Sequence, residues 1–390
     1  KGGNEYIKGF MNQTYMNIFY KLIKLGDNEI LVNIYQFLVN CVIGSNEFAK
    51  FIFSEQEFIR LCIQYLAQNE SVKMEHEAKK AAIYFFISLS KFSNSFSEKQ
   101  KNTFYKIYEK FLGVHFDSVF LMHIIVGIRF LFTFDKSKEK TIFNIIKKKN
   151  YDIFDKLFKT FNNIYKDDPE FSGKDIIIFN IKKIIDHFIQ LSEEKDIIFL
   201  VGNTLLINFI NHFFEVLFFK TTRILLLDII VELSHHTSDV VLNMIQDRAE
   251  FLETIKKYLN STHFDIKMKF IDIVHSMLSL LSHDIDIILY RNEIIDYLIK
   301  VNLLLEEEKT CLKLILSSIL FFIKGIKPLN NDLKIEIINN LIKSGISNGF
   351  ENLSTRFSEE HISLINEINS GINNILNVRN DEKNIIKGSG

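Results

Sequence analysis

Apolar residues recur at helical spacing along the whole chain, in segments of about 8 to 16 residues separated by short polar breaks. The stretch from Phe37 to Phe53, FLVNCVIGSNEFAKFIF, shows an apolar helix, a break at Gly44, Ser45 and Asn46, and then a second short helix. Few segments alternate between apolar and polar residues as a strand does, and only 2 prolines occur in 390 residues. This pattern predicts an all-α protein.

The apolar helices repeat with a period of about 45 residues. One series marks the centre of one apolar helix in each repeat, at Asn40, Ser88, Phe132, His187, Glu232, Ser276 and Phe321. A second series marks the end of the helix that follows each centre, at Leu66, Leu112, Phe158, Phe214, Leu259 and Leu304. Because two series share one period, we interpret the chain as a repeat array rather than a set of separate domains.

Both series contain one longer step, and both place it at the same polar stretch. Residues 166–175, KDDPEFSGKD, hold Pro169 and Gly173, two residues that interrupt helices. We therefore interpret this stretch as a loop insertion within one repeat.

A period near 45 is typical of armadillo and HEAT repeats, whose two or three helices bury their apolar faces only by stacking on neighbouring repeats. A short helix at 46–53, a middle helix at 56–66 and a long third helix favour the armadillo type. The sequence predicts a right-handed superhelical armadillo/HEAT-type solenoid of about eight repeats over residues 1–378, with an incomplete first repeat. It also predicts a terminal cap at 358–377 and a flexible tail at 379–390. An irregular helical protein of another type is the alternative.

Composition narrows the class of protein. Hydrophobic residues make up 47% of the chain and charged residues 24%, which is enough to bury a large core and argues against disorder. The 47 basic and 48 acidic residues nearly balance, so overall charge does not favour nucleic acid or a membrane surface as a partner. Cys41, Cys62 and Cys311 lack the spacing of a disulfide set or a zinc site. We expect a soluble intracellular protein without a cofactor.

Signals of catalysis are weak. The motifs HExxH, GxxxxGK[ST] and CxxC do not occur in the sequence. His235 and His236 lie close to Asp239, but adjacent histidines point to different faces of a helix, and no third ligand has zinc spacing. We interpret the pair as a turn or helix-end feature and expect the protein not to be an enzyme.

The repeats resemble those of the importin-α family, the adapters that carry proteins with basic localisation signals into the nucleus. In that family the third helix of most repeats has a Trp, an Asn four residues later, and a turn that contains Gly. This sequence matches at Asn40 and Gly44, with Gln36 at the Trp position. The next repeat has Tyr84 at the Trp position and Ser88 at the Asn position.

Later segments follow the family in order and in length. Residues 181–209 resemble the central repeat, with Lys183 where that repeat has Arg. Residues 264–300 resemble the penultimate groove repeat, and residues 349–372 resemble the terminal capping repeat. The resemblance therefore covers nearly the whole chain.

The binding positions depart from the family pattern. The seven Trp positions hold Gln36, Tyr84, Ile128, Lys183, Asp228, Asp272 and Ser317. The seven Asn positions hold Asn40, Ser88, Phe132, His187, Glu232, Ser276 and Phe321. The loss of every Trp removes cation–π contacts of about 0.5–2 kcal/mol each, and among these positions Tyr84 alone offers a replacement.

The resemblance implies a concave groove in which Asn side chains bind the backbone of an extended peptide and aromatic walls hold its lysines. We expect Asn40 to be buried and functional there, with a capping or helix-surface role as its alternative. Asp228, Glu232 and Asp272 would attract a basic segment by charge, or else form a solvated face. The candidate peptide-binding residues are Gln36, Asn40, Tyr84, Ser88, Lys183, His187, Asp228, Glu232, Asp272 and Ser276.

The leading hypothesis is thus an importin-α-like transport adapter with a degenerate peptide site, present in cytoplasm and nucleus. Its partners would be basic segments of cargo proteins and importin-β, the latter through an Arg/Lys-rich segment that residues 1–10 lack. We expect no direct nucleic-acid or membrane partner. The alternative is a non-enzymatic armadillo scaffold that packs against one fixed protein partner, and an upstream Arg/Lys-rich segment would favour the adapter.

Overall fold

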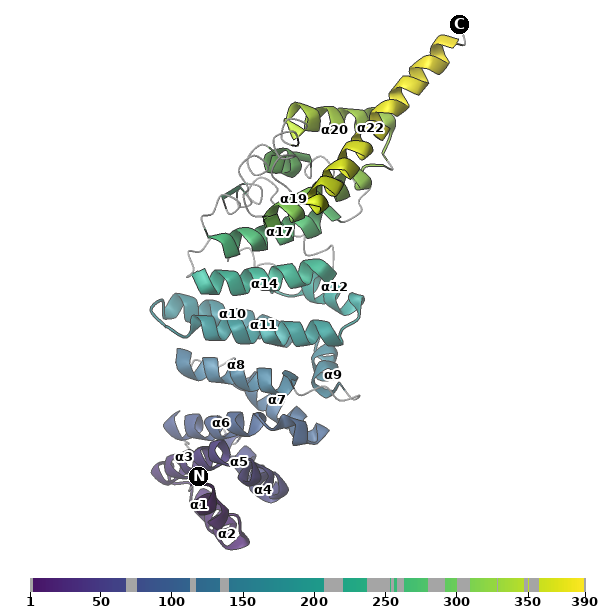
Figure 1. The fold of residues 1–390 in the computed structure, drawn as a ribbon. Helices are drawn as coiled ribbons and strands as arrows, with labels where there is room; N and C mark the ends of the chain where they lie inside the picture. The colour runs from purple at the N-terminus through teal and green to yellow at the C-terminus, as the bar shows by residue number, and fades with distance from the viewer. Residues whose placement is uncertain are drawn as a thin grey trace. The chain divides into compact units, whose positions relative to one another are not determined.

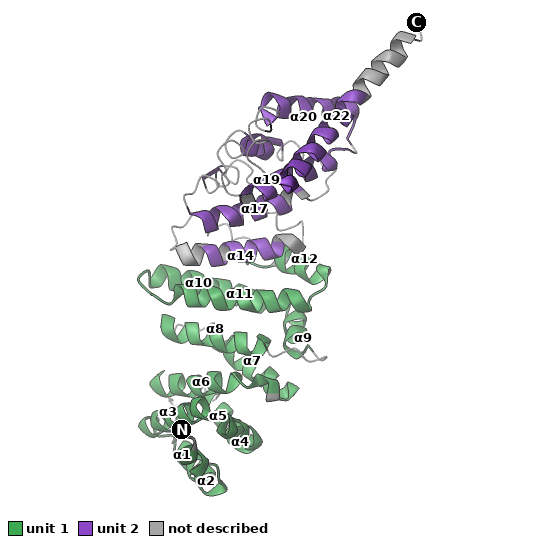
Figure 2. Cartoon of the chain, in the orientation of Figure 1, with its two compact units in different colours: residues 1–209 green, residues 210–390 purple. Residues whose placement is uncertain are grey.

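The part of the chain that the computed structural model describes is built of helices (Figure 1). It describes residues 3–67, 76–112, 117–133, 140–206, 220–236, 253, 256–257, 263–279, 292–299, 309–327, 329–346, 350 and 358–388, and no strand occurs within these ranges. The chain divides into two compact units, residues 1–209 and residues 210–390 (Figure 2).

Unit 1 contains a regular succession of short, middle and long helices. Its helices are α1 (Gly3–Gly9), α2 (Gln13–Leu25), α3 (Asn28–Gly44), α4 (Asn46–Ser54), α5 (Gln56–Ala67), α6 (His76–Ser90), the 3₁₀ turn η1 (Ser93–Ser95), α7 (Glu98–Leu112), α8 (Ser118–Thr133), α9 (Thr141–Lys148), α10 (Asp152–Asp167), α11 (Lys174–Leu191) and α12 (Glu194–Asn203). The predicted short helix is α4 and the predicted middle helix is α5. The predicted third helices are α3, α6, α8 and α11, which pack on one another in that order.

The break GSN between α3 and α4 shows how the sequence sets a helix boundary. Ser45 has an extended backbone, and its N–H donates to the carbonyl of Cys41 at 3.0 Å, which ends α3. The Ser45 hydroxyl oxygen accepts from the N–H of Phe48 at 3.2 Å, which caps the start of α4. A single residue therefore ends one helix and begins the next, so the chain turns sharply between them.

The core of unit 1 is rich in aromatic rings that join neighbouring helices. The rings of Phe86 on α6 and Phe104 on α7 meet edge to face with centroids 5.0 Å apart. The rings of Phe154 on α10 and Phe188 on α11 meet in the same way at 5.1 Å. These four side chains are buried, so each aromatic contact ties one helix of the array to the next.

A close approach of α7 and α8 depends on Gly127. A Cβ atom at this position would lie 2.9 Å from the ring of Tyr108 and 3.1 Å from Cγ1 of Ile87 on α6. The buried Tyr108 hydroxyl is 2.6 Å from the buried hydroxyl of Ser90, so the ring is held at both its face and its tip.

The insertion between α10 and α11 is shorter than the sequence predicts. Residues 168–173 form the loop, because α10 continues to Asp167 and α11 begins at Lys174. The expectation that Phe158 ends its helix was wrong, since α10 runs nine residues further. Much of the extra length of this repeat is therefore helical.

Unit 2 contains α14 (Lys220–His236), α17 (Phe264–Ser279), α19 (Lys309–Gly325), α20 (Asn331–Lys343) and α22 (Glu359–Gly388) among its described residues. The predicted third helices α14, α17 and α19 pack in order, and α22 packs on α19 and α20. Residues 379–388, predicted to be a flexible tail, belong to α22. The helix ends predicted at Phe214, Leu259 and Leu304 lie outside the described residues.

Candidate functional site

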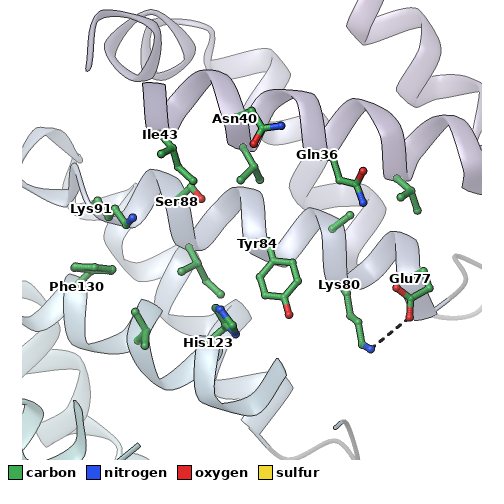
Figure 3. Close-up of a pocket in the computed structure, with 15 residues that line it drawn as sticks. Gln36, Asn40, Ile43, Glu77, Lys80, Tyr84, Ser88, Lys91, His123 and Phe130 are labelled. Carbon is green, nitrogen blue, oxygen red and sulfur yellow. Dashed lines mark hydrogen bonds and ion pairs between the residues drawn. The ribbon is translucent and has the colours of Figure 1, made fainter. Parts of the chain in front are cut away.

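A pocket of about 760 Å³ crosses three consecutive third helices of unit 1 (Figure 3). The side chains that line it come from α3, from α6 with the residue that follows it, and from α8. They are Val32, Gln36, Val39, Asn40, Ile43, Glu77, Lys80, Ala81, Tyr84, Ile87, Ser88, Lys91, His123, Val126 and Phe130. The structure therefore brings together four residues predicted from the sequence, Gln36, Asn40, Tyr84 and Ser88.

The side of the pocket formed by α3 carries two amides. Gln36 and Asn40 are both exposed, one helical turn apart. The expectation of a buried Asn40 was wrong, because Leu38 and Cys41 take the buried face of α3 and turn Asn40 outward. An exposed amide keeps its donor and acceptor available to a ligand.

Tyr84 stands in the middle of the pocket (Figure 3). Its ring contacts the ring of His123 edge to face at 4.8 Å and that of Phe120 at 6.2 Å, so two residues of α8 fix its orientation. Burial raises the pKa of the Tyr84 hydroxyl, with a smaller contribution from Asp117, so the hydroxyl stays protonated at neutral pH. Ser88 follows one turn along α6, where its side chain is 6% exposed.

One end of the pocket holds a paired cation. The Nζ of Lys80 lies 2.5 Å from a carboxylate oxygen of Asp117 and 3.4 Å from one of Glu77. Asp117 also accepts from the N–H of Phe120 at 2.8 Å and so caps α8. The hydrogen bond to Asp117 raises the pKa of Lys80. Burial alone would raise the pKa of Asp117, but the hydrogen bonds from Lys80 and Phe120 outweigh it and the pKa is lowered.

The two positions of α8 that the repeat pattern aligns with the family's Trp and Asn do not line the pocket. Ile128 is fully buried and Phe132 is 2% exposed, so both belong to the core. Val126 and Phe130 line the pocket in their place. Apolar residues occur on every side of α8, so the sequence pattern does not show which side of the helix is buried. The polar His123, seven residues before Phe130, marks the side that faces the pocket.

Lys183 and His187 on α11 do not line this pocket. Both are partly exposed. The Lys183 Nζ lies 3.6 Å from a carboxylate oxygen of Asp186 and 5.8 Å from the ring centre of Phe179. Their role in peptide binding stays a prediction.

The remaining candidates lie on α14 and α17 in unit 2. Asp228, Glu232 and Asp272 are partly exposed, whereas Ser276 is buried at 5% exposure. Asp228 forms an ion pair with Lys269 at 2.7 Å, so part of the expected negative charge is already balanced within the unit. This pairing could not be predicted from the sequence, because the two residues lie about one repeat apart.

Neither a metal site nor a membrane-spanning helix occurs in the described ranges. No three His, Cys, Asp or Glu side chains there lie close enough together to hold a metal ion. No helix among these residues combines the length and the apolar composition needed to cross a membrane.

Comparisons with known proteins identify the fold. No protein-family model matches the sequence. No curated protein matches it either. An engineered protein from a structural genomics consortium superposes with a TM-score of 0.50 at 14% identity, over 95% of this chain and 92% of that one. A designed armadillo repeat protein in complex with the peptide (KR)4 superposes with a TM-score of 0.50 at 15% identity, over 68% of this chain and 98% of that one. The chain is thus an all-α solenoid of the armadillo type.

Proposed function

We propose that this protein is a non-enzymatic armadillo-type protein that binds an extended peptide segment of a partner protein between α3, α6 and α8. The observation that carries the proposal is the combination of exposed amides and a half-buried aromatic ring in one pocket across consecutive third helices. The ring supplies a wall for an apolar or alkyl side chain, and the amides supply both donors and acceptors.

The spacing of these groups suits an extended chain. Side chains four residues apart on a helix, such as Gln36 and Asn40, lie about 5–6 Å apart. Alternate residues of an extended peptide are about 6.6–6.8 Å apart, so two amides in this arrangement can reach successive backbone groups on one side of the peptide. Binding through the peptide backbone depends little on sequence, which suits an adapter or scaffold.

A designed armadillo repeat protein of similar fold is in complex with a peptide, (KR)4. That protein supports the proposal by analogy of fold, since a stack of third helices offers an extended binding surface in repeat proteins generally. The likeness concerns the fold alone, and the side chains that would contact a peptide in this pocket are determined by this chain's own sequence.

Selection from a displayed library of extended peptides on the full chain tests the proposal. We expect binding peptides to emerge and Asn40→Ala to weaken their binding by about fivefold, because a backbone hydrogen bond is worth about 1 kcal/mol. Asn163→Ala, which removes an exposed amide on α10 outside the pocket, is the matched control and should leave affinity unchanged. A library that gives no binders would contradict the proposal and favour a scaffold that packs against one folded partner.

A transport adapter of the importin-α type is a more specific candidate. Asp228, Glu232 and Asp272, partly exposed on the packed helices α14 and α17, favour it, because carboxylates attract a basic localisation signal. In this case the protein would act between cytoplasm and nucleus, take basic segments of cargo as ligands, and bind importin-β through an upstream basic segment.

Titration with a lysine-rich localisation peptide tests this candidate. The triple variant Asp228→Ala, Glu232→Ala and Asp272→Ala is expected to lower affinity about tenfold, since three attractions of about 0.5 kcal/mol are lost. Affinity that is unchanged in the triple variant would rule out an acidic groove on these helices. Circular dichroism of the variant controls for folding.

A further inference from the structure

The charged groups around the pocket between α3, α6 and α8 are unevenly paired. At one end the two carboxylates Glu77 and Asp117 share Lys80, at 3.4 Å and 2.5 Å. His76 also lies 4.0 Å from Asp117. The acids at this end are therefore already in contact with basic side chains of the protein.

The opposite end holds Lys91 beside the ring of Phe130, and Arg129, which does not line the pocket, lies against the same ring. The Nζ of Lys91 lies 6.0 Å from the ring centre of Phe130, and the guanidinium carbon of Arg129 lies 4.6 Å from it. Neither cation forms an ion pair with any residue that the structure describes, and the buried Nε of Arg129 has no hydrogen-bond partner. Figure 3 shows Lys91 and Phe130 together at the end of the pocket remote from Glu77.

Between the two ends, the lining is largely apolar. Tyr84 and Ile87 on α6 and Val126 on α8 all line the pocket. A ligand side chain that fills this part gains binding free energy in proportion to the apolar area that it removes from water.

We propose that the peptide bound here carries a carboxylate side chain that binds beside Lys91, and an apolar side chain two residues away that packs among Tyr84, Ile87 and Val126. This inference rests on the proposed function and specifies the ligand of the same pocket. A carboxylate at this end adds a charge-assisted contact to Lys91, which has no anionic partner in the described part of the chain.

The same charges disfavour a basic peptide at this pocket. A lysine of the ligand would meet unbalanced positive charge at the Lys91 end, and at the other end it would have to displace Lys80 from two carboxylates. The pocket in unit 1 therefore has the opposite charge preference from the one expected for the carboxylates of unit 2.

Three labelled octapeptides test the inference on the full chain by fluorescence anisotropy at about 50 mM salt, where charge effects are weakly screened. Each repeats a four-residue unit of two leucines and two copies of one other residue, which is aspartate, asparagine or lysine. This order places both kinds of side chain on each side of an extended peptide. We expect the aspartate peptide to bind most tightly and the lysine peptide most weakly. Lys91→Gln should weaken binding of the aspartate peptide about fivefold and leave the asparagine peptide unchanged.

Lys106→Gln, which removes an exposed lysine of α7 outside the pocket, is the matched control and should change neither affinity. Equal affinities for the aspartate and asparagine peptides, both lost in Tyr84→Ala, would overturn the inference and leave the proposed function standing. Tighter binding of the lysine peptide would also overturn it. If none of the three peptides binds, the inference falls together with the function on which it rests.

Discussion

Gly127→Leu is expected to lower the free energy of unfolding of unit 1 by about 3 kcal/mol, the upper part of the range for overpacking a core. The new Cβ alone would lie 2.9 Å from the ring of Tyr108 and 3.1 Å from Ile87. The Tyr108 ring cannot retreat freely, because its hydroxyl pairs with that of Ser90 at 2.6 Å in the core. Urea unfolding followed by circular dichroism measures the change.

Gly202→Leu is the matched control. Gly202 is an exposed residue of α12, and an added Cβ there meets no atom within 4 Å. Replacing a helical glycine at such a position is expected to stabilise by up to about 1 kcal/mol through helix propensity. Equal effects of the two substitutions would show that the close packing of α7 and α8 does not limit the size of the residue at Gly127.

Tyr84→Ala is expected to weaken binding of a selected peptide about thirtyfold, equivalent to the roughly 2 kcal/mol of an aromatic hot spot. The ring packs edge to face against His123 and Phe120, and the side chain lines the pocket. Its removal takes away the main wall for a ligand side chain. Isothermal titration calorimetry on the full chain measures the loss.

Tyr84→Phe separates the ring from its hydroxyl. The ring stays in place against His123 and Phe120, so this variant should lose no more than about threefold, the value of one neutral hydrogen bond. An unchanged affinity in Tyr84→Ala would contradict the assignment of the pocket as the peptide site.

The helical repeat could be predicted from the sequence because its signals are local. The GSN break sets a helix end and a helix start through one side chain, Ser45, and capping by such residues follows general rules. The third helices were predicted from apolar spacing alone, and all seven are helical in the structure. Short-range patterns thus identified the elements and their order.

The orientation of individual helices was harder to predict. Around α8 apolar residues occur on every side, so the pattern did not distinguish the buried Ile128 from Val126 in the pocket. Ion pairs between repeats could not be predicted from the sequence either, because each joins residues about 40 positions apart. Examples are Lys80 with Asp117 and Lys269 with Asp228. The binding site depends on these non-local contacts more than the fold does.

Photo-crosslinking tests most directly whether a peptide binds across α3, α6 and α8. A benzophenone side chain in place of the exposed Gln36 is expected to attach to a selected peptide, and unlabelled peptide should compete with the reaction. The same group in place of Lys106, exposed on α7 outside the pocket, should attach to none. Mass spectrometry that finds the adduct at position 36 alone would agree with the proposed site. Equal attachment at both positions, or none at position 36 despite binding, would contradict it.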